Sequence, residues 1–277
     1  MIQTKQYRIG RIIFIIVLVF LLMVFLFPIY WMVLTSLKTR IQTFEIPPIW
    51  FFKPTFENYK SLLTAVDVSR SYMNSIIISV SAIVLTMLLG SMAAYGLTRF
   101  KFRGKGDLNF WILTTRMFPP VAIIIPVYML FRNFNILDTH IALILMYVVF
   151  NLGIAIWMLE GFFSEIPIEL EESAFLDGCS RFKVLWSIIY PLGKSGIVAT
   201  SIFCLIFTWN EYLYAVILTG RSARTMPVTV AGAITDRGVM WGELTAVAVL
   251  VAIPILIFAA LIQRHLIRGL TFGAIKQ

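Results

Sequence analysis

The sequence predicts an all-α membrane protein with six transmembrane helices, and three observations support this fold class. Of the 277 residues, 60% are hydrophobic and 13% are charged, and the mean hydropathy is +0.89. So few polar side chains cannot cover a water-soluble globule of this length. Several apolar stretches reach the roughly 20 residues that a helix needs to cross the membrane. A cluster of cations at 99–105, between two of these stretches, is typical of a cytoplasmic loop.

The expected spans cover about 12–36, 73–98, 110–131, 141–162, 197–218 and 244–262. The first is longer than the core of a cleavable signal peptide, and no small-x-small site follows it, so we expect it to remain as an anchor. With the amino terminus inside, six crossings place both termini in the cytoplasm. The predicted organisation is an anchor with an external loop over 1–72, a transmembrane core over 73–263 and a cytoplasmic tail over 264–277.

The external segment 37–72 combines prolines with aromatic side chains, which suits the membrane interface. Contact with an external partner protein is the alternative interpretation. The net charge of +9 fits membrane orientation and contact with lipid headgroups. No basic soluble domain is present to carry nucleic-acid binding, so we expect membrane lipid and no nucleic acid among the partners.

The segment 164–193, before the fifth span, predicts two short helices joined by a turn. Its start is rich in carboxylates, which are stabilised by the positive end of the dipole at the beginning of a helix. Asp177 and Gly178 supply the turn, because glycine accepts a positive φ. Ser180 can cap a second helix that Pro191 helps to end after residue 190. An amphipathic hairpin on the membrane surface has the same pattern, so periodicity alone leaves both interpretations open.

The residues of this segment resemble the EAA loop of permease subunits of ATP-binding-cassette (ABC) importers. That pattern is Glu-Ala-Ala, three residues, Gly, nine residues, Ile, one residue and Leu-Pro. The matching positions are Glu172, Ala174, Gly178, Ile188 and Pro191. Ser173 and Tyr190 depart from the pattern with changes that keep the geometry plausible. Stretches at 93–100, 117–120, 137–139, 209–212 and 269–276 resemble the carbohydrate branch, which contains the MalG-type maltose permease.

The resemblance implies a type I ABC importer permease fold with cytoplasmic EAA coupling helices. In that family these helices dock into a groove on a separate ATPase subunit. The implied coupling residues are Glu172, Ser173, Ala174, Gly178, Ile188 and Pro191. The implied partners are a second, MalF-type permease subunit, two ATPase subunits and an extracytoplasmic solute-binding protein. Transport would follow alternating access driven by ATP, and the resemblance implies the plasma membrane of a bacterium or archaeon.

The chain shows no ATPase site of its own. Gly193, Lys194 and Ser195 look like the end of a P-loop, but Ile188 stands where the loop requires a glycine. The two histidines are expected at opposite membrane faces and cannot share a metal ion. We therefore expect no catalytic residue, no metal site and no cofactor bound by this chain, with ATP and Mg used by the partner ATPase.

Ionisable residues inside a membrane are expensive and usually face the bundle interior. A rise of about 1.5 Å per residue places Arg116 and Glu160 at reachable depths near the inner surface, so we expect an ion pair there. The fifth span combines a stacking surface with polar groups, as sugar sites do. These candidate translocation residues are Trp209, Asn210, Glu211 and Tyr212. A polar lock between helices is the alternative interpretation.

The leading hypothesis is the permease subunit of an ATP-driven sugar importer. An ion-coupled secondary transporter is the runner-up, but it would be expected to show inverted repeats, and no convincing repeat is found. A membrane enzyme or scaffold comes third. Pro119, Pro120 and Pro254 are expected to bend the third and sixth spans, either as moving or as static kinks. The solute is left open among sugars and polyol derivatives.

Overall fold

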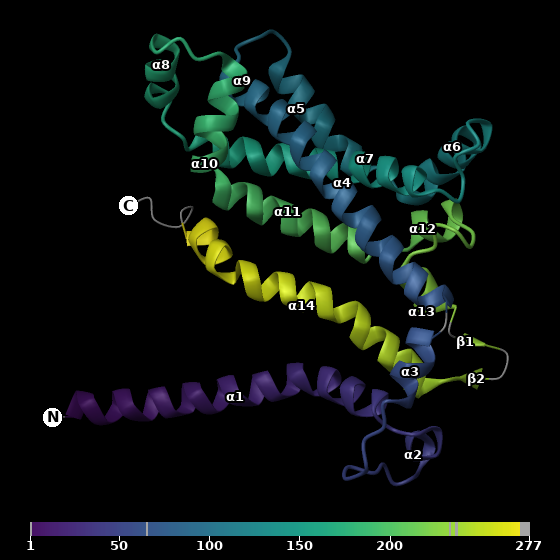
Figure 1. The fold of residues 1–277 in the computed structure, drawn as a ribbon. Coiled ribbons are helices and arrows are strands. Elements are labelled where there is room, and N and C mark those ends of the chain that lie inside the picture. The colour runs from purple at the N-terminus through teal and green to yellow at the C-terminus, as the bar shows by residue number, and fades with distance from the viewer. Residues whose placement is uncertain (1, 65, 233, 236–237, 272–277) are drawn as a thin grey trace. The chain divides into compact units, whose positions relative to one another are not determined.

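A computed structural model describes residues 2–64, 66–232, 234–235 and 238–271, and nearly all of its regular structure is helical (Figure 1). Residues 272–276, from the last stretch of the resemblance at 269–276, lie outside the described residues. The chain forms two compact units, Met1–Val66 with Val230–Ile253 and Asp67–Thr229 with Pro254–Gln277. By length and composition, four described helices can cross a membrane, and the number rises to six when each of two bent pairs counts as one span.

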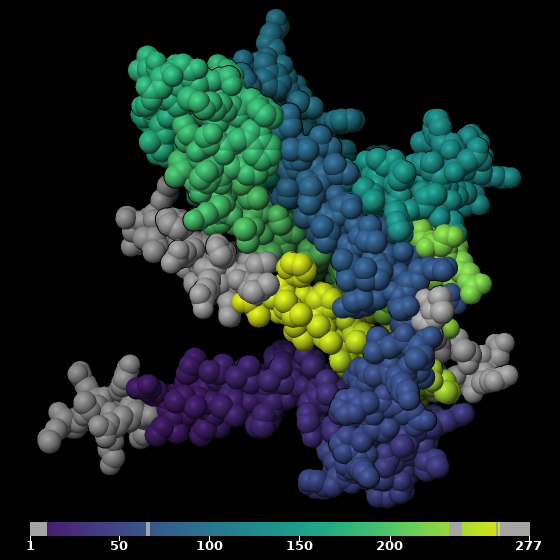
Figure 2. Space-filling view, in the orientation of Figure 1, coloured from purple at the N-terminus to yellow at the C-terminus, as the bar shows by residue number. Residues whose placement is uncertain are grey.

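The first unit begins with α1 (Ile2–Ser36), whose apolar run Gly10–Ser36 is left uncovered within its unit. The run Gly10–Ser36 is purple in Figure 2. A helix that is apolar on all sides needs lipid or a partner helix around it. The unit also contains α2 (Arg40–Phe44), α3 (Glu57–Thr64) and the first part of α14 (Trp241–Thr271). The helix α14 continues through Pro254, so the expected sixth span is present as one helical element.

A short antiparallel strand pair precedes α14 and was not anticipated by the all-α prediction. Strands β1 (Ile234–Thr235) and β2 (Gly238–Val239) pair with Ile234 opposite Val239. Helix α13 (Met226–Ala231) lies just before them in the chain. The pair is only two residues long on each side, so it leaves the helical fold class unchanged.

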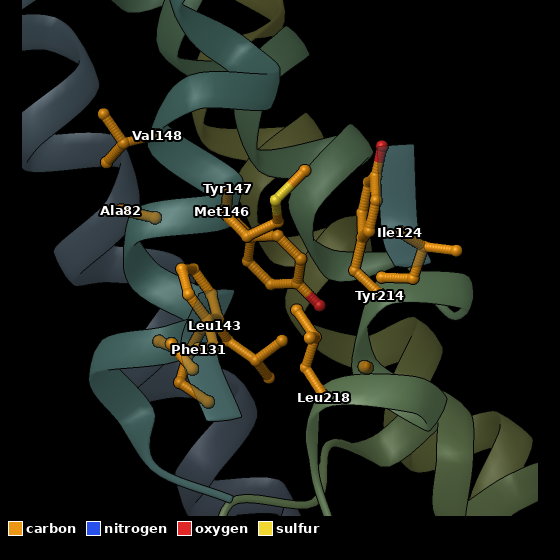
Figure 3. Close-up of a cluster of buried hydrophobic side chains, with 12 residues drawn as sticks. Ala82, Ile124, Phe131, Leu143, Met146, Tyr147, Val148, Tyr214 and Leu218 are labelled. Carbon is orange, nitrogen blue, oxygen red and sulfur yellow. The ribbon is translucent and has the colours of Figure 1, made fainter. Parts of the chain in front are cut away.

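In the second unit, α7 (His140–Ser164) and α11 (Lys194–Trp209) pack along each other, with α4 (Val66–Arg99) beside them (Figure 1). A buried apolar cluster joins α4, α6 (Pro120–Asn133), α7 and α12 (Leu213–Leu218) (Figure 3). Tyr147 is almost completely buried in it, and its ring lies among apolar side chains from neighbouring helices. This packing fixes the helices that carry the candidate site residues.

The expected span 110–131 is not one continuous helix, because the chain bends sharply in its middle. Helix α5 (Lys105–Thr114) and the 3₁₀ turn η1 (Thr115–Met117) meet α6 (Pro120–Asn133) at an angle of 92°. Phe118 and Pro119 are extended, with ψ of 129° and 125°. A residue before proline is disfavoured in the helical region, and proline offers no N–H to the preceding turn. The expected bend at Pro119 and Pro120 is therefore confirmed.

The expected single span 197–218 is also wrong. Helix α11 ends at Trp209, and α12 (Leu213–Leu218) begins after a break of three residues. The Glu211 carboxylate accepts backbone N–H groups from Tyr214 at 2.8 Å and Ala215 at 3.1 Å. A side-chain acceptor at this place satisfies the free N–H groups of a new helix and so favours a restart over continuation.

Candidate functional site

The segment 164–193 folds as two helical pieces joined by a turn, as the sequence predicts. Helix α8 (Glu169–Leu176) is followed by Asp177 and Gly178, whose φ of +79° is the left-handed conformation that glycine favours. The second piece contains α9 (Arg181–Val184), the π-helical turn η2 (Leu185–Ile189) and α10 (Tyr190–Leu192). Ser180 caps it by accepting the Lys183 N–H at 3.3 Å. We call residues 169–192 the coupling loop.

The second piece does not end at residue 190 as expected but continues through Pro191 to Leu192. In the π turn, the Tyr190 N–H bonds to the carbonyl of Leu185, five residues earlier. This wider turn relaxes the conflict between a proline ring and the carbonyl four residues before it. The helix then stops at Gly193, where an added Cβ would lie 2.9 Å from the Ile189 carbonyl and 3.0 Å from the Phe163 ring.

A buried charged cluster fastens the coupling loop to the membrane helices. The Glu171 carboxylate forms an ion pair with Arg99 at the end of α4, and the side chains are 2% and 9% exposed. The Tyr95 hydroxyl donates to the same carboxylate at 2.9 Å. The Arg99 guanidinium also donates to the carbonyls of Phe163 at 3.1 Å and Ile166 at 2.8 Å. We call Tyr95, Arg99 and Glu171 the Glu171 anchor.

The residues expected to couple the chain to an ATPase divide between two sides of the loop. Four of them are exposed: Glu172, Ser173, Gly178 and Pro191. Ala174 is buried in the apolar cluster under the loop, and Ile188 packs against that cluster. The loop therefore presents the glutamate of the EAA pattern outward while its neighbour Glu171 holds the loop in place. Sequence analysis missed this inward role, although Glu171 and Arg99 were both visible as charges.

The expected ion pair between Arg116 and Glu160 is wrong. Arg116 donates to the carbonyl of Phe150 at 3.1 Å, and its guanidinium lies over the Phe150 ring at 4.5 Å. Glu160 instead accepts both hydrogen bonds from the Asn109 amide, each at 3.0 Å. Phe150 and Glu160 are about 15 Å apart along α7 at the rise of a helix. Asn109 lies level with Glu160 and takes its carboxylate, whereas Arg116 follows seven residues later, about 10 Å further along the helix.

The stretch from Trp209 to Tyr212 lies at the break between α11 and α12. Glu211 accepts the Tyr147 hydroxyl at 3.0 Å in addition to its two backbone contacts. The Trp209 side chain is buried and meets the Tyr72 ring edge-on, at 6.2 Å between centroids. These contacts favour the polar-lock interpretation for Glu211. Asn210 and Tyr212 are more exposed, and Asn210 donates to the Ile206 carbonyl at 2.8 Å.

A second loop is fastened by a carboxylate outside the expected spans. Asp138 accepts backbone N–H groups from residues 220–223, including Gly220 at 2.8 Å and Ala223 at 3.0 Å. Partial burial raises the pKa of Asp138, but the backbone donors outweigh it and hold that pKa below its ordinary value. We call Asp138 and the backbone of 220–223 the Asp138 cradle. Sequence analysis used 137–139 only as a point of resemblance and missed this contact.

The loop of the Asp138 cradle is held from its other side by α4. The Asn74 amide donates to the carbonyls of Ser222 at 2.9 Å and Arg224 at 3.0 Å, and its oxygen lies 2.7 Å from His140 Nε2. Within the described part of the chain, no group of three or more His, Cys, Asp or Glu side chains is placed to hold a metal ion.

The chain matches the family described as "Binding-protein-dependent transport system inner membrane component" over residues 86–272. It belongs to this family. The permease is 39% identical to the probable ABC transporter permease protein y4oR of Sinorhizobium fredii, over 91% of each chain. It is 33% identical to the trehalose/maltose transport system permease protein MalG of Thermococcus litoralis, over 98% of this chain and 99% of that one.

The permease also shares its fold with a solved importer. A chain in the crystal structure of a bacterial ABC transporter that imports the acidic polysaccharide alginate superimposes with a TM-score of 0.79 at 23% identity. The match covers 93% of this chain and 96% of that one. The expected ABC importer permease fold is thereby confirmed. The permease is a multi-pass membrane protein, and in this class ATP hydrolysis belongs to a separate subunit.

Proposed function

We propose that this permease forms half of the translocation pathway of an ATP-driven, binding-protein-dependent sugar importer. The observation that carries the proposal is the two-sided coupling loop, with Glu172 exposed on one side and Glu171 buried against Arg99 on the other. Such a loop can receive a push from a partner and pass it to α4. A sugar as solute is supported by the trehalose/maltose permease and the alginate importer that the chain resembles.

The proposed assembly contains a second, MalF-type permease, two ATPase subunits and an extracytoplasmic binding protein. ATP and Mg act in the ATPase subunits, and this chain binds no cofactor. Both termini lie in the cytoplasm in this proposal, and the cation cluster at 99–105 supports that orientation. This cluster directly follows α4, so the coupling loop and the cations belong to the same membrane face.

The coupling residues that face the ATPase in this proposal are Glu172, Ser173, Gly178 and Pro191, because these are exposed. Ala174 and Ile188 support them from the apolar side of the loop. A movement of the loop reaches α4 through Arg99 and reaches α7 through the Phe163 carbonyl. A charge-assisted contact resists separation more strongly than a neutral one, which suits a mechanical link.

The proposed translocation path runs along the breaks in the third and fifth spans. Non-helical backbone at membrane depth is tolerated where it lines a cavity or is buried in protein. A cavity of about 360 Å³ adjoins the first break. Its lining includes Trp111, Thr115, Arg116, Phe118, Phe150 and Tyr214. Aromatic faces with a guanidinium and hydroxyl groups suit a sugar, and Tyr212 adds an exposed ring at the second break.

The proposal is tested by the ATPase rate of the assembly, purified with its partner permease and ATPase, with and without solute-loaded binding protein. Stimulation by the binding protein is expected in the wild type and is expected to disappear in Glu172→Lys while the subunits stay together. Glu165→Lys is the matched control, because Glu165 is exposed just before the coupling loop. Full stimulation in Glu172→Lys would contradict the coupling role.

A flux measurement separates the proposal from an ion-coupled transporter. Proteoliposomes loaded with ATP are expected to move labelled sugar at the same rate whether or not an ionophore has collapsed the ion gradients. Uptake that needs a gradient and ignores ATP would overturn the proposed function.

A further inference from the structure

Lys38 carries a buried charge that no described residue neutralises. It lies just beyond the end of α1 and is only 3% exposed. Its ammonium lies over the Trp31 ring at 4.8 Å and the Phe52 ring at 5.3 Å. Within the described residues, no carboxylate lies within ion-pair distance of the ammonium, and no hydrogen bond from it is found. A cation held only by ring faces lacks the acceptors that normally compensate burial.

The ammonium borders a cavity of about 380 Å³, a volume typical of small-molecule sites. Trp31 and Thr35 from the end of α1 form one wall, and Trp241 from the start of α14 forms another. Helix α2 closes a further side and contributes Gln42. All of these residues belong to one compact unit.

Hydrogen bonds from neighbouring side chains fix the backbone around Lys38. The Asn58 amide donates to the carbonyls of Ser36 at 2.8 Å and Lys38 at 2.9 Å. The Ser36 hydroxyl lies 2.7 Å from the Tyr59 hydroxyl. These contacts tie the start of the 37–64 segment to α3 and keep the lysine at the cavity wall.

The cavity lies at the level of the lipid headgroups. The apolar run of α1 ends at Ser36, and that of α14 begins at Trp241. Since the end of one span and the start of another line the same cavity, the cavity marks one membrane surface. Tryptophan rings are enriched at this level. Phospholipids at this level carry a phosphate, and often an amine, above two acyl chains.

We propose that this cavity binds the headgroup of a zwitterionic phospholipid of the phosphoethanolamine type. The phosphate lies against the buried Lys38 ammonium, and the amine lies toward Glu45, the other charged residue among the described lining residues. Glu45 is exposed, which suits the outer end of the headgroup, whereas Lys38 is buried. A ligand carrying only negative charge would meet repulsion from Glu45. The inference is independent of which solute the permease transports.

Native mass spectrometry of the full-length permease, purified with its partner subunits and stripped of lipid, tests the proposal by titration with phosphatidylethanolamine. The wild type is expected to bind one lipid tightly. Its affinity is expected to fall about tenfold in Lys38→Met, since a charge-assisted contact is lost. Lys60→Met is the matched control, because Lys60 is an exposed lysine of the same unit. Lys38→Arg keeps the charge and is expected to keep the lipid.

Two further measurements test the proposal without a substitution at Lys38. Glu45→Gln is expected to remove the preference for phosphatidylethanolamine over phosphatidylglycerol. Inorganic phosphate added to the wild type is expected to leave the bound lipid in place and to leave thermal stability unchanged, whereas phosphatidylethanolamine raises it. Equal lipid retention by the wild type and a folded Lys38→Met would overturn the proposal, and so would displacement of the lipid by inorganic phosphate.

Discussion

The Glu171 anchor and the Asp138 cradle both hold a loop to the helices with a single carboxylate, but they use different partners. In the anchor, the carboxylate meets a guanidinium and a phenol, and both charges are almost fully buried. In the cradle, the carboxylate is only partly buried and meets backbone N–H groups. The anchor therefore depends on a matched pair of side chains, whereas the cradle depends on the course of the backbone.

This difference predicts unequal sensitivity to substitution. A buried guanidinium that loses its carboxylate has little access to water and becomes a destabilising charge. Backbone N–H groups near the surface can turn to water when the carboxylate is removed, so the loss is limited to the hydrogen bonds. The coupling loop is thus held by the Glu171 anchor, the contact that tolerates substitution less well. This suits a permease whose coupling loop must move together with α4.

The largest effect is expected at the anchor. Glu171→Ala leaves the Arg99 charge buried without a counter-charge and is expected to lower the free energy of unfolding by about 3–5 kcal/mol. Thermal unfolding of the detergent-solubilised assembly measures it. Glu172→Ala is the neighbouring control and is expected to stay within about 0.5 kcal/mol, because Glu172 is exposed. Equal losses in the two variants would show that the burial of Glu171 does not matter.

Exchanging the two charges sharpens the same point. In the double variant Arg99→Glu with Glu171→Arg, the opposite charges are kept, but the carbonyls of Phe163 and Ile166 lose their donor. We expect at most partial recovery of stability relative to Glu171→Ala. Full recovery would mean that charge pairing alone holds the loop, without the contacts to α7.

A smaller effect is expected at the cradle. Asp138→Asn keeps an acceptor and tolerates the residue's φ of +55°, so the variant tests the charge alone. A loss of about 1–2 kcal/mol is expected from weaker hydrogen bonds. Because the folded pKa lies below the unfolded one, the carboxylate stabilises the fold above the unfolded pKa, and that stabilisation is lost as pH falls through the folded pKa.

The pH dependence provides the measurement. The difference in thermal stability between wild type and Asp138→Asn is expected to be constant near neutral pH and to shrink below about pH 4, where the wild-type carboxyl gains a proton. A difference that grows on acidification would contradict the role of the backbone donors. Asp107→Asn, at an exposed aspartate of the same unit, is the control and is expected to show no such trend.

A substitution in the turn of the coupling loop is expected to lower the free energy of unfolding by no more than Asp138→Asn does. Gly178→Ala places a Cβ on a residue with φ of +79°, where no neighbouring atom would touch it, so only backbone strain is added. The expected loss is about 1 kcal/mol. Gly161→Ala in α7 also meets no neighbour and is expected to be neutral or slightly stabilising, since alanine suits a helix. Equal effects would remove the case for a left-handed turn.

Local chemistry made part of this structure predictable from sequence. Gly178 predicted the turn and Ser180 predicted the helix cap, because each residue acts on backbone within a few positions. The partnership of Arg99 with Glu171 joins positions 72 residues apart, and no local pattern encodes it. Glu211 was mistaken for part of a continuous span because its capping role exists only once the helix has broken. Arg116 was paired with Glu160 because depth alone could not show that the Asn109 amide binds the Glu160 carboxylate.

The smallest effect is expected at the one exposed ion pair found among the described residues. Arg221 and Asp67 approach to 3.2 Å, but their side chains are 76% and 53% exposed. Water and salt screen such a pair, and ordering two mobile side chains offsets much of the attraction. Arg221→Gln is therefore expected to change the free energy of unfolding by at most about 1 kcal/mol, and by less as salt is raised. The Arg221 backbone N–H still donates to Asp138 in the variant, so the cradle persists.

The same thermal unfolding measures the effect. A loss as large as that of Glu171→Ala would show that exposure does not separate the two ion pairs, and it would remove the distinction between buried and surface anchoring.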